Sequence, residues 1–392
     1  MCRDPLRLDF MNAPTAPVVT VLMKNLNQYR LPFYEKLRTE LQDSGVTLRL
    51  VTADGLSEDT AKGDSASLDW AERRAFRELQ VRGKTLLWQP GFDLARDSDL
   101  IITEQASKQL FNVVLAYGQR LFGTKHVFWG HGKNFQSSRE GESGESLKRR
   151  LTQRAHWFLS YNDLSTLAAI EAGMPATRIT PVMNSTDTRH IRNAIKDIDP
   201  EQVRRELGIG TGPVGLFIGG IYPYKRPEFL IEAAIAIREQ APSFELIIIG
   251  DGTLGHVAEA AASQHPWIHW LGSMYGDERL GPASIASLQL MPGLIGLNIV
   301  DGFALGLPTI TIDDEFHSPE IDYLETDVNG LLLPHGASPQ EYAAEVVELL
   351  ADSGRLDELR RGATEWGEKL STENMVTRFV EGVHAALAAS PR

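Results

Sequence analysis

The chain has 392 residues, a length that fits two α/β domains of roughly 150 to 200 residues each better than one ordinary domain. Hydrophobic residues make up 42% and charged residues 23%, values typical of globular proteins. The formal net charge of −13 argues against a nucleic-acid partner, because such proteins need a basic face for the phosphate backbone. We therefore expect a folded two-domain protein that does not bind nucleic acid.

Cysteine content and hydropathy predict a cytoplasmic protein. Cys2 is the one cysteine, so neither an intrachain disulfide nor a four-cysteine zinc site can form. No stretch approaches the roughly 18 to 20 consecutive apolar residues that span a bilayer, and the N-terminus lacks the apolar core of a secretion signal. Residues 1–16, which include prolines at 5 and 14, are predicted to form an N-terminal tail.

The first half alternates predicted strands with helical patterns. The apolar run VVTVLM (18–23) predicts a buried strand, FYEKLRTEL a helix, and TLRLVT (47–52) the next strand, which together make a βαβ unit. Further strands are predicted at 85–88, 99–103, 126–129, 157–160 and 178–182. We expect a parallel sheet with helices on both faces over residues 17–195.

The second half repeats this α/β arrangement. Strands are predicted at 213–220, 244–250, 267–272, 287–292, 308–313 and 330–334. We place the boundary near 190–212 and assign residues 196–375 to the second domain. The stretch 338–388 is predicted to be helical throughout, with a C-terminal helix, 376–392, that crosses back to the first domain. Doubly wound domains bind ligands at the carboxyl ends of their strands, so the cleft between the domains is the expected site.

The segment GGIYPYKRPEFLIEAA (219–234) is the clearest local signal for anion binding. A strand ends in Gly219 and Gly220, a short loop carries Lys225 and Arg226, and a helix follows. Helix N-termini favour anions and cationic side chains add charge-assisted hydrogen bonds, so this segment suits a diphosphate. The alternative is a solvated Lys-Arg pair before an ordinary helix.

The segment LMPGLIGLNIVDGFALGLPTI (290–310) is the second candidate. It predicts a strand, a glycine loop, and a helix that carries Asp301 about two turns from its start. A buried carboxylate needs hydrogen-bond donors, and ribose hydroxyls supply them. Asp301 on a wet helix face is the alternative, but its neighbours Ile299, Val300 and Phe303 are apolar, so we favour a ribose contact.

The order of these motifs resembles that of the family 4 retaining glycosyltransferases, which have the GT-B fold of two Rossmann-like, doubly wound domains facing a cleft. The resemblance covers about residues 213–335. Besides the segment ending in Lys225, it is carried by LIIIGDGT (246–253), IHWLGSMYGDE (268–278), ALGLP (304–308), SPEI (318–321) and NGLLL (329–333).

The resemblance implies a nucleotide diphosphate sugar as donor, a glycan or lipid-linked acceptor, a role in polysaccharide biosynthesis, and no metal or other cofactor. It gives Lys225 and Arg226 the task of neutralising the leaving diphosphate. The implied donor-binding residues lie on the loops after the strands: Gly219, Gly220, Gly250, Gly272, Met274, Gly293, Gly296, Leu297 and Asp301.

Three positions depart from the family pattern. Gly220 stands where the family has arginine, Gly293 where it has the first of two glutamates, and Asp301 replaces the second. We interpret these departures as altered sugar recognition. A non-catalytic nucleotide-sugar-binding subunit is one alternative. A dinucleotide oxidoreductase is another, although the first strand lacks GxGxxG.

The first half resembles the same group at two loops. KNLNQYRLPFY (24–34) resembles an acceptor loop, which implies acceptor contacts from Asn25, Asn27, Gln28, Tyr29 and Arg30. HVFWGHGKN (126–134) places His131 at a strand end, where the family histidine faces the reacting sugar. A structural histidine is the alternative. His126 and His131 lack an accompanying carboxylate or cysteine cluster, so we reject a metal site.

The run SLKRRLTQRAHWF (146–158) predicts a basic helix with apolar neighbours. Such a run usually forms a solvated face. In an acidic protein it also suits peripheral contact with anionic lipid headgroups at the inner membrane surface, or with a lipid diphosphate acceptor.

Overall fold

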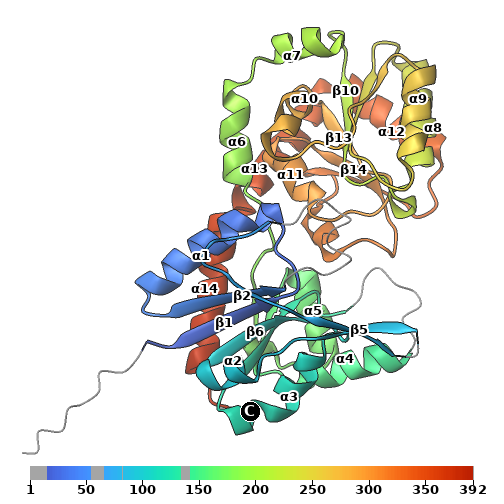
Figure 1. Cartoon of the computed structure of the whole chain (residues 1–392). Helices are drawn as coiled ribbons and strands as arrows, with labels where there is room; N and C mark the ends of the chain where they lie inside the picture. The colour runs from blue at the N-terminus through green and yellow to red at the C-terminus, as the bar shows by residue number, and fades with distance from the viewer. Residues whose placement is uncertain (1–15, 54–65, 82, 134–141, 392) are drawn as a thin grey trace, which may run out of the picture.

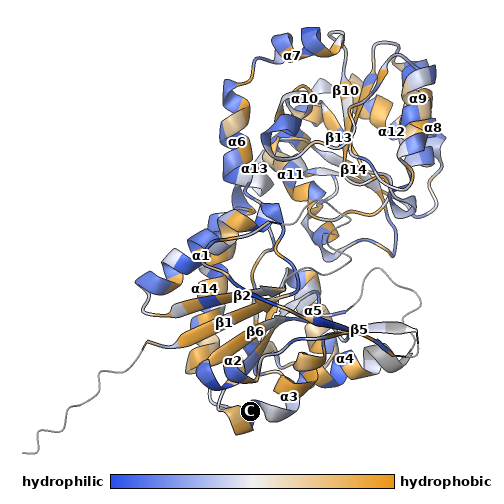
Figure 2. Cartoon of the chain, in the orientation of Figure 1, coloured by the Kyte–Doolittle hydropathy of each residue, from blue (hydrophilic) through white to orange (hydrophobic). Residues whose placement is uncertain are grey.

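The computed structural model describes residues 16–53, 66–81, 83–133 and 142–391, which form two domains, each built on a parallel sheet (Figure 1). The first sheet has the order β3-β2-β1-β6-β7-β8-β9, and the second has the order β12-β11-β10-β13-β14-β15. Figure 2 shows strands of both sheets in hydrophobic colours, as expected for strands that are covered on both faces.

The first sheet is sandwiched between two layers of helices. Its strands are β1 (Val18–Met23), β2 (Thr47–Ala53), β3 (Glu72–Arg74), β6 (Leu100–Glu104), β7 (Lys125–Gly130), β8 (Trp157–Ser160) and β9 (Ile179–Pro181). Helices α1 (Leu31–Asp43) and α14 (Thr372–Ala388) pack on one face. The other face is covered by α2 (Phe92–Asp97), α3 (Leu110–Phe122), α4 (Glu142–Arg154) and α5 (Asp163–Glu171).

The predicted strand at 85–88 forms outside the parallel sheet. It belongs to β5 (Lys84–Trp88), which pairs antiparallel with β4 (Arg77–Val81) in a separate hairpin. Gly83, with φ of 75°, adopts the left-handed conformation that such a tight reversal requires. The expectation that this segment joins the parallel sheet is therefore wrong.

The second domain surrounds its sheet in the same way. Its strands are β10 (Val214–Ile218), β11 (Glu245–Ile249), β12 (Ile268–Trp270), β13 (Leu288–Leu290), β14 (Thr309–Ile312) and β15 (Gly330–Leu333). Its helices are α8 (Pro227–Gln240), α9 (Gly255–Gln264), α10 (Leu280–Ser284), α11 (Asn298–Ala304), α12 (Pro339–Ala351) and α13 (Ser353–Lys369). The core of this domain comprises two apolar clusters, a larger one that includes Leu246 and Ile248 and a smaller one that includes Ile247.

The chain crosses between the domains near residues 182–187 and returns near 370–372. Helix α6 (Thr188–Ala194), which the predicted boundary assigns to the first domain, packs on the second, because Ile191 lies against Leu280 and Ala304. It is followed by α7 (Pro200–Leu207). Three separate helices, α12 to α14, replace the continuous helical stretch expected over 338–388. The last of them begins at Thr372 rather than 376 and packs against α1 of the first domain.

Candidate functional site

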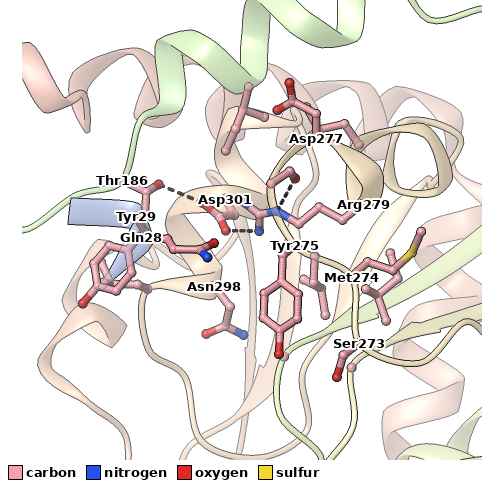
Figure 3. A pocket seen from close by; sticks show the side chains of 18 of the residues that line it. Gln28, Tyr29, Thr186, Ser273, Met274, Tyr275, Asp277, Arg279, Asn298 and Asp301 are labelled. Atoms are coloured by element: carbon pink, nitrogen blue, oxygen red, sulfur yellow. Dashed lines mark hydrogen bonds and ion pairs between the residues drawn. The ribbon is translucent and has the colours of Figure 1, made fainter. Parts of the chain in front are cut away.

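A cavity of about 630 Å³ lies between the domains at the carboxyl ends of β10 and β11. Figure 3 shows Gln28 and Tyr29 of the first domain on one side of it and Met274 and Tyr275 of the second domain on the other. Of the residues predicted from sequence, eight line it: Gln28, Tyr29, Gly219, Gly220, Gly250, Met274, Leu297 and Asp301. The cavity lies where a doubly wound domain places its ligand.

Two glycines allow the strand ends to approach each other at the cavity wall. Gly219 and Gly250 have φ of 143° and 142°, a backbone region that favours glycine. A β-carbon on Gly250 would be 1.9 Å from the carbonyl oxygen of Gly219, so a side chain cannot be placed there. A β-carbon on Gly219 would meet no atom within 4 Å, so this backbone is open to a ligand.

Asp301 lies at the centre of a polar cluster in the cavity. It belongs to the first turn of α11, not the second as expected, because the helix begins only at Asn298. Thr186 donates from Oγ1 to Asp301 Oδ1 at 2.7 Å, and Arg279 donates from Nη1 to Oδ2 (Figure 3). The carboxylate is 8% exposed and retains lone pairs for a ribose hydroxyl.

Sequence reasoning missed Arg279 and Thr186, both of which line the cavity. Arg279 is the last residue of η5 (Gly276–Arg279) and stands directly after the IHWLGSMYGDE segment, and Asp301 is the main reason that its pKa lies above the ordinary value. Thr186 lies in the segment between the domains, to which the sequence assigned no site residue.

The loop after β12 forms the wall opposite the first domain. Ser273, Met274 and Tyr275 line the cavity, and Tyr275 is 49% exposed. Gly272 does not line the cavity; its carbonyl accepts from the amide of Gly250 at 2.7 Å and so ties this loop to the glycine wall. The loop can cover a flat ring with Met274 and Tyr275.

Lys225 and Arg226 lie behind the cavity wall. Lys225 is 8% exposed and donates from Nζ to the Leu294 carbonyl at 2.5 Å, and burial lowers its pKa to about 8. Arg226 forms an ion pair with Asp314 at 2.8 Å. Neither residue is among the described residues that line the cavity. The two cations therefore do not point together into the cavity, contrary to the expectation from sequence.

Gly220 and Gly293, which stand where the family pattern has arginine and glutamate, are both explained by the loop 220–226. A β-carbon on Gly220 would lie 2.3 Å from the ring of Tyr222, and one on Gly293 would lie 2.6 Å from the carbonyl carbon of Lys225. Leu294 N–H also donates to the Tyr224 carbonyl at 2.8 Å. The loop therefore occupies the space from which the family's arginine and glutamate side chains would start.

The glycine loop before α11 is held by side chains. Asn298 Oδ1 accepts from the amide of Gly296 at 2.9 Å, and His317 Nδ1 accepts from the amide of Ile295 at 2.9 Å. The N–H of Gly296, one of the implied donor-binding residues, is thus already bonded within the loop. Leu297 does line the cavity.

The predicted acceptor loop divides into cavity residues and structural residues. Gln28 and Tyr29 lie in η1 (Gln28–Arg30) and reach the cavity, whereas Asn25 donates to Asn27 at 2.9 Å within the loop. Arg30 is 7% exposed, and its guanidinium lies 5.1 Å from the Trp129 ring centroid. Arg30 is therefore a packed residue rather than an exposed acceptor contact.

Arg30 begins a buried chain of hydrogen bonds that joins the domains. Its Nη2 donates to Asn184 Oδ1, and Asn184 Nδ2 donates to Glu320 Oε1 at 2.7 Å. Asn184 and Glu320 are 1% and 3% exposed. Glu320 belongs to the SPEI motif, so this motif joins the second domain to the segment between the domains.

His131 follows β7 at the cleft edge of the first sheet but does not line the cavity. Its ring packs edge-on against Tyr161, with centroids 4.4 Å apart, and burial lowers its pKa while nearby Glu320 acts in the opposite direction. Gly132, with φ of 82°, packs closely against α5. A β-carbon at this position would be 2.8 Å from the Ser165 carbonyl oxygen, so the helix leaves no space for a side chain.

His126 is a structural histidine. It is fully buried, shares a hydrogen bond of 2.9 Å with Thr103, and has a pKa lowered to about 3 by burial. Within the described ranges, no group of three or more His, Cys, Asp or Glu side chains could hold a metal ion. No helix of that part of the chain is long and apolar enough to cross a membrane.

The structure is similar to that of HepE from Anabaena in complex with UDP, with a TM-score of 0.71, 17% identity, and coverage of 94% of this chain and 99% of that one. It also resembles sucrose-phosphate synthase from Thermosynechococcus elongatus, with a TM-score of 0.69, 15% identity, and coverage of 95% and 100%. The chain has the GT-B fold. The prediction of two facing Rossmann-like domains is confirmed.

The family model that matches this chain covers much of the second domain. Residues 212–352 match the family model described as Glycosyl transferases group 1. Spore coat protein SA of Bacillus subtilis is 25% identical over 199 residues, 46% of this chain and 52% of that protein. D-inositol 3-phosphate glycosyltransferase of Salinispora arenicola is 27% identical over 243 residues, which are 58% of this chain and 51% of that protein. The chain spans about half the length of the curated relatives it matches.

Proposed function

We propose that the chain is a retaining glycosyltransferase of the family 4 type, which moves a hexose from a nucleotide diphosphate sugar to a glycan or lipid-linked acceptor in polysaccharide or glycoconjugate biosynthesis. The observation that carries the proposal is the cavity in which the glycine wall, Asp301 and the 273–275 loop face Gln28 and Tyr29 of the other domain. The group 1 match over 212–352 supports it, and so does the UDP bound to HepE.

Each part of the cavity suits one part of the donor. Asp301 accepts hydrogen bonds from ribose hydroxyls, and Met274 and Tyr275 cover the base. Gly219 gives the diphosphate close access to the backbone. Lys225 supplies positive charge from behind the 293–296 loop, so the leaving diphosphate needs no metal ion.

The first domain serves both the donor sugar and the acceptor. We assign His131 to contact with the donor sugar at the cleft edge, and Gln28 and Tyr29 to the border of the acceptor. The exposed side chains of Arg149, Arg150 and Arg154 on α4 support peripheral contact with anionic lipid at the cytoplasmic membrane face.

The test is turnover by the purified full chain. It is incubated with UDP-, GDP-, ADP- and TDP-sugars in the presence of EDTA, and release of the nucleoside diphosphate is measured. We expect one donor class to be consumed, with the anomeric configuration retained in the product. Loss of turnover in EDTA that manganese or magnesium restores would overturn the metal-independent mechanism.

A non-catalytic nucleotide-sugar-binding subunit is the second candidate. It is favoured by one observation, the absence of side chains at Gly220 and Gly293, where the family pattern has arginine and glutamate. Donor binding without any turnover in the same experiment would favour this candidate.

A further inference from the structure

The cavity carries an excess of negative charge. Among the described residues that line it, four are aspartates and one is a lysine or arginine, and that one is Arg279. The aspartates are Asp187, Asp251, Asp277 and Asp301. A diphosphate adds further negative charge, so the cavity needs internal compensation before it can accept one.

Two aspartates are already committed to the backbone. Asp187 caps α6 by accepting from the amide of His190 at 3.1 Å, and Asp251 accepts from the amide of Gly252 at 2.7 Å. Asp277 pairs with His190 Nε2 at 2.7 Å near the cavity mouth, where both side chains are more than half exposed. Asp301 is different, because it is buried and its charge is balanced by Arg279.

The side chain of Arg279 is positioned to pair with Asp301. Its side chain is 23% exposed, Nε donates to the Gly276 carbonyl at 3.3 Å, and Nη1 donates to Asp301 Oδ2. Figure 3 shows the guanidinium next to the carboxylate, with Thr186 on the other side of Asp301. Two donors from two segments therefore fix the carboxylate in the orientation in which its remaining lone pairs can accept ribose hydroxyls.

We propose that Arg279 is a nucleotide-positioning residue, which neutralises and orients Asp301 so that the carboxylate can hold ribose without repelling the attached diphosphate. This inference rests on the proposed donor site. It also accounts for how the cavity tolerates a phosphate while Gly220 stands in place of the family's arginine and Arg226 is engaged by Asp314. Without Arg279 the buried carboxylate would be unbalanced.

The experiment is a double-mutant cycle on nucleotide affinity, measured by calorimetry with the full chain. Wild type is titrated with UDP, GDP and ADP, and the tightest ligand is used for Arg279→Gln, Asp301→Asn and the double variant. We expect Arg279→Gln to weaken binding at least 10-fold in the wild-type background and less than 3-fold in the Asp301→Asn background, because the charge to be neutralised is gone. Arg279→Gln should reduce the affinity for the matching uncharged nucleoside less than the affinity for the nucleoside diphosphate.

Arg355→Gln is the matched control, since Arg355 pairs with Asp327 at 2.8 Å outside this cavity, and its affinity should equal that of wild type. Unchanged affinity in Arg279→Gln would overturn the inference, and so would an equal loss in both backgrounds, because Arg279 would then act independently of Asp301. If the wild type binds none of the nucleotides, the proposed donor site itself is wrong.

Discussion

The ring of Tyr222 lies directly against the α-carbon of Gly220, so that a β-carbon at position 220 would be 2.3 Å from Cε2 of the ring. Tyr222 in turn stacks on Tyr224, with centroids 5.6 Å apart and planes 25° from parallel. The ring of Tyr222 and the backbone of Gly220 both line the cavity. This contact explains why the family's arginine position is a glycine in this chain.

Gly220→Ala should displace the Tyr222 ring rather than unfold the domain, because a ring can rotate away from a new methyl group. We expect nucleotide affinity to fall several-fold with a melting temperature close to that of wild type. Tyr222→Ala should remove the conflict, so adding Gly220→Ala to it should have no further effect on affinity. An equal loss in both backgrounds would show that the ring is not the cause.

Gly293→Ala should be destabilising, because the new methyl group would meet backbone atoms of Tyr224 and Lys225, at 2.4 to 2.7 Å, which cannot rotate away. We expect a loss of about 1–3 kcal/mol in the free energy of unfolding, measured by chemical denaturation. Gly296→Ala is the matched stability control, since its β-carbon would meet nothing closer than 3.8 Å. Equal stabilities of the two variants would contradict this account of Gly293.

Lys225→Ala should weaken diphosphate binding by roughly 10-fold, about 1.5 kcal/mol, the low end of the range for contacts to a charged group, because Lys225 acts from behind the cavity wall. Burial lowers the Lys225 pKa to about 8, so the ammonium is lost as the pH rises above 8. Affinity of the wild type should therefore fall from pH 7 to pH 9.5, and Lys225→Ala should lack that fall.

The effect of Lys225 on stability has the opposite sign. Below pH 8 the lysine is charged in both the folded and unfolded states, so the cost of burying the charge is fully present. Between pH 8 and its ordinary pKa of 10.5 the unfolded state binds more protons, so the contribution to stability rises with pH. Parallel loss of affinity and stability above pH 8 would indicate general unfolding instead.

His131→Ala should lower sugar transfer by about 100-fold or more, in the range for losing a positioned polar contact, with little change in melting temperature. His126 is the matched structural histidine, five residues earlier, on β7. Since it is fully buried and bonded to Thr103, His126→Ala should lower the melting temperature and leave turnover per folded molecule near normal. The reverse pattern would make His131 structural.

The strands of the parallel sheets other than β3 could be predicted from sequence because short apolar runs between turn residues specify buried strands directly. The polar edge strand β3, with the sequence ERR, offers no such run. The hairpin at β4 and β5 could not be predicted, since its short alternating segment resembles any other strand until its partner is known. The register of Leu79 opposite Leu86 is visible only in the structure.

The sequence marks three residues that line the cavity, Gly219, Gly250 and Asp301, because they lie in motifs at predicted strand ends and at a helix start. Arg279 escaped prediction since its role depends on a contact across 22 residues of sequence, and no local pattern marks it. The burial of Arg30 could not be predicted for the same reason, because its partners Asn184 and Trp129 are distant in sequence.

The central claim is that the cavity between the domains binds the nucleoside diphosphate of the donor. The most direct test is calorimetric titration of wild type and Ser273→Trp with UDP, GDP and ADP, because an indole at position 273 would fill the cavity that Ser273 lines. We predict that the wild type binds one of these nucleotides at a single site per chain and that Ser273→Trp, folded by circular dichroism, does not. Binding of none of them by the wild type, or equal binding by both proteins, would contradict the claim.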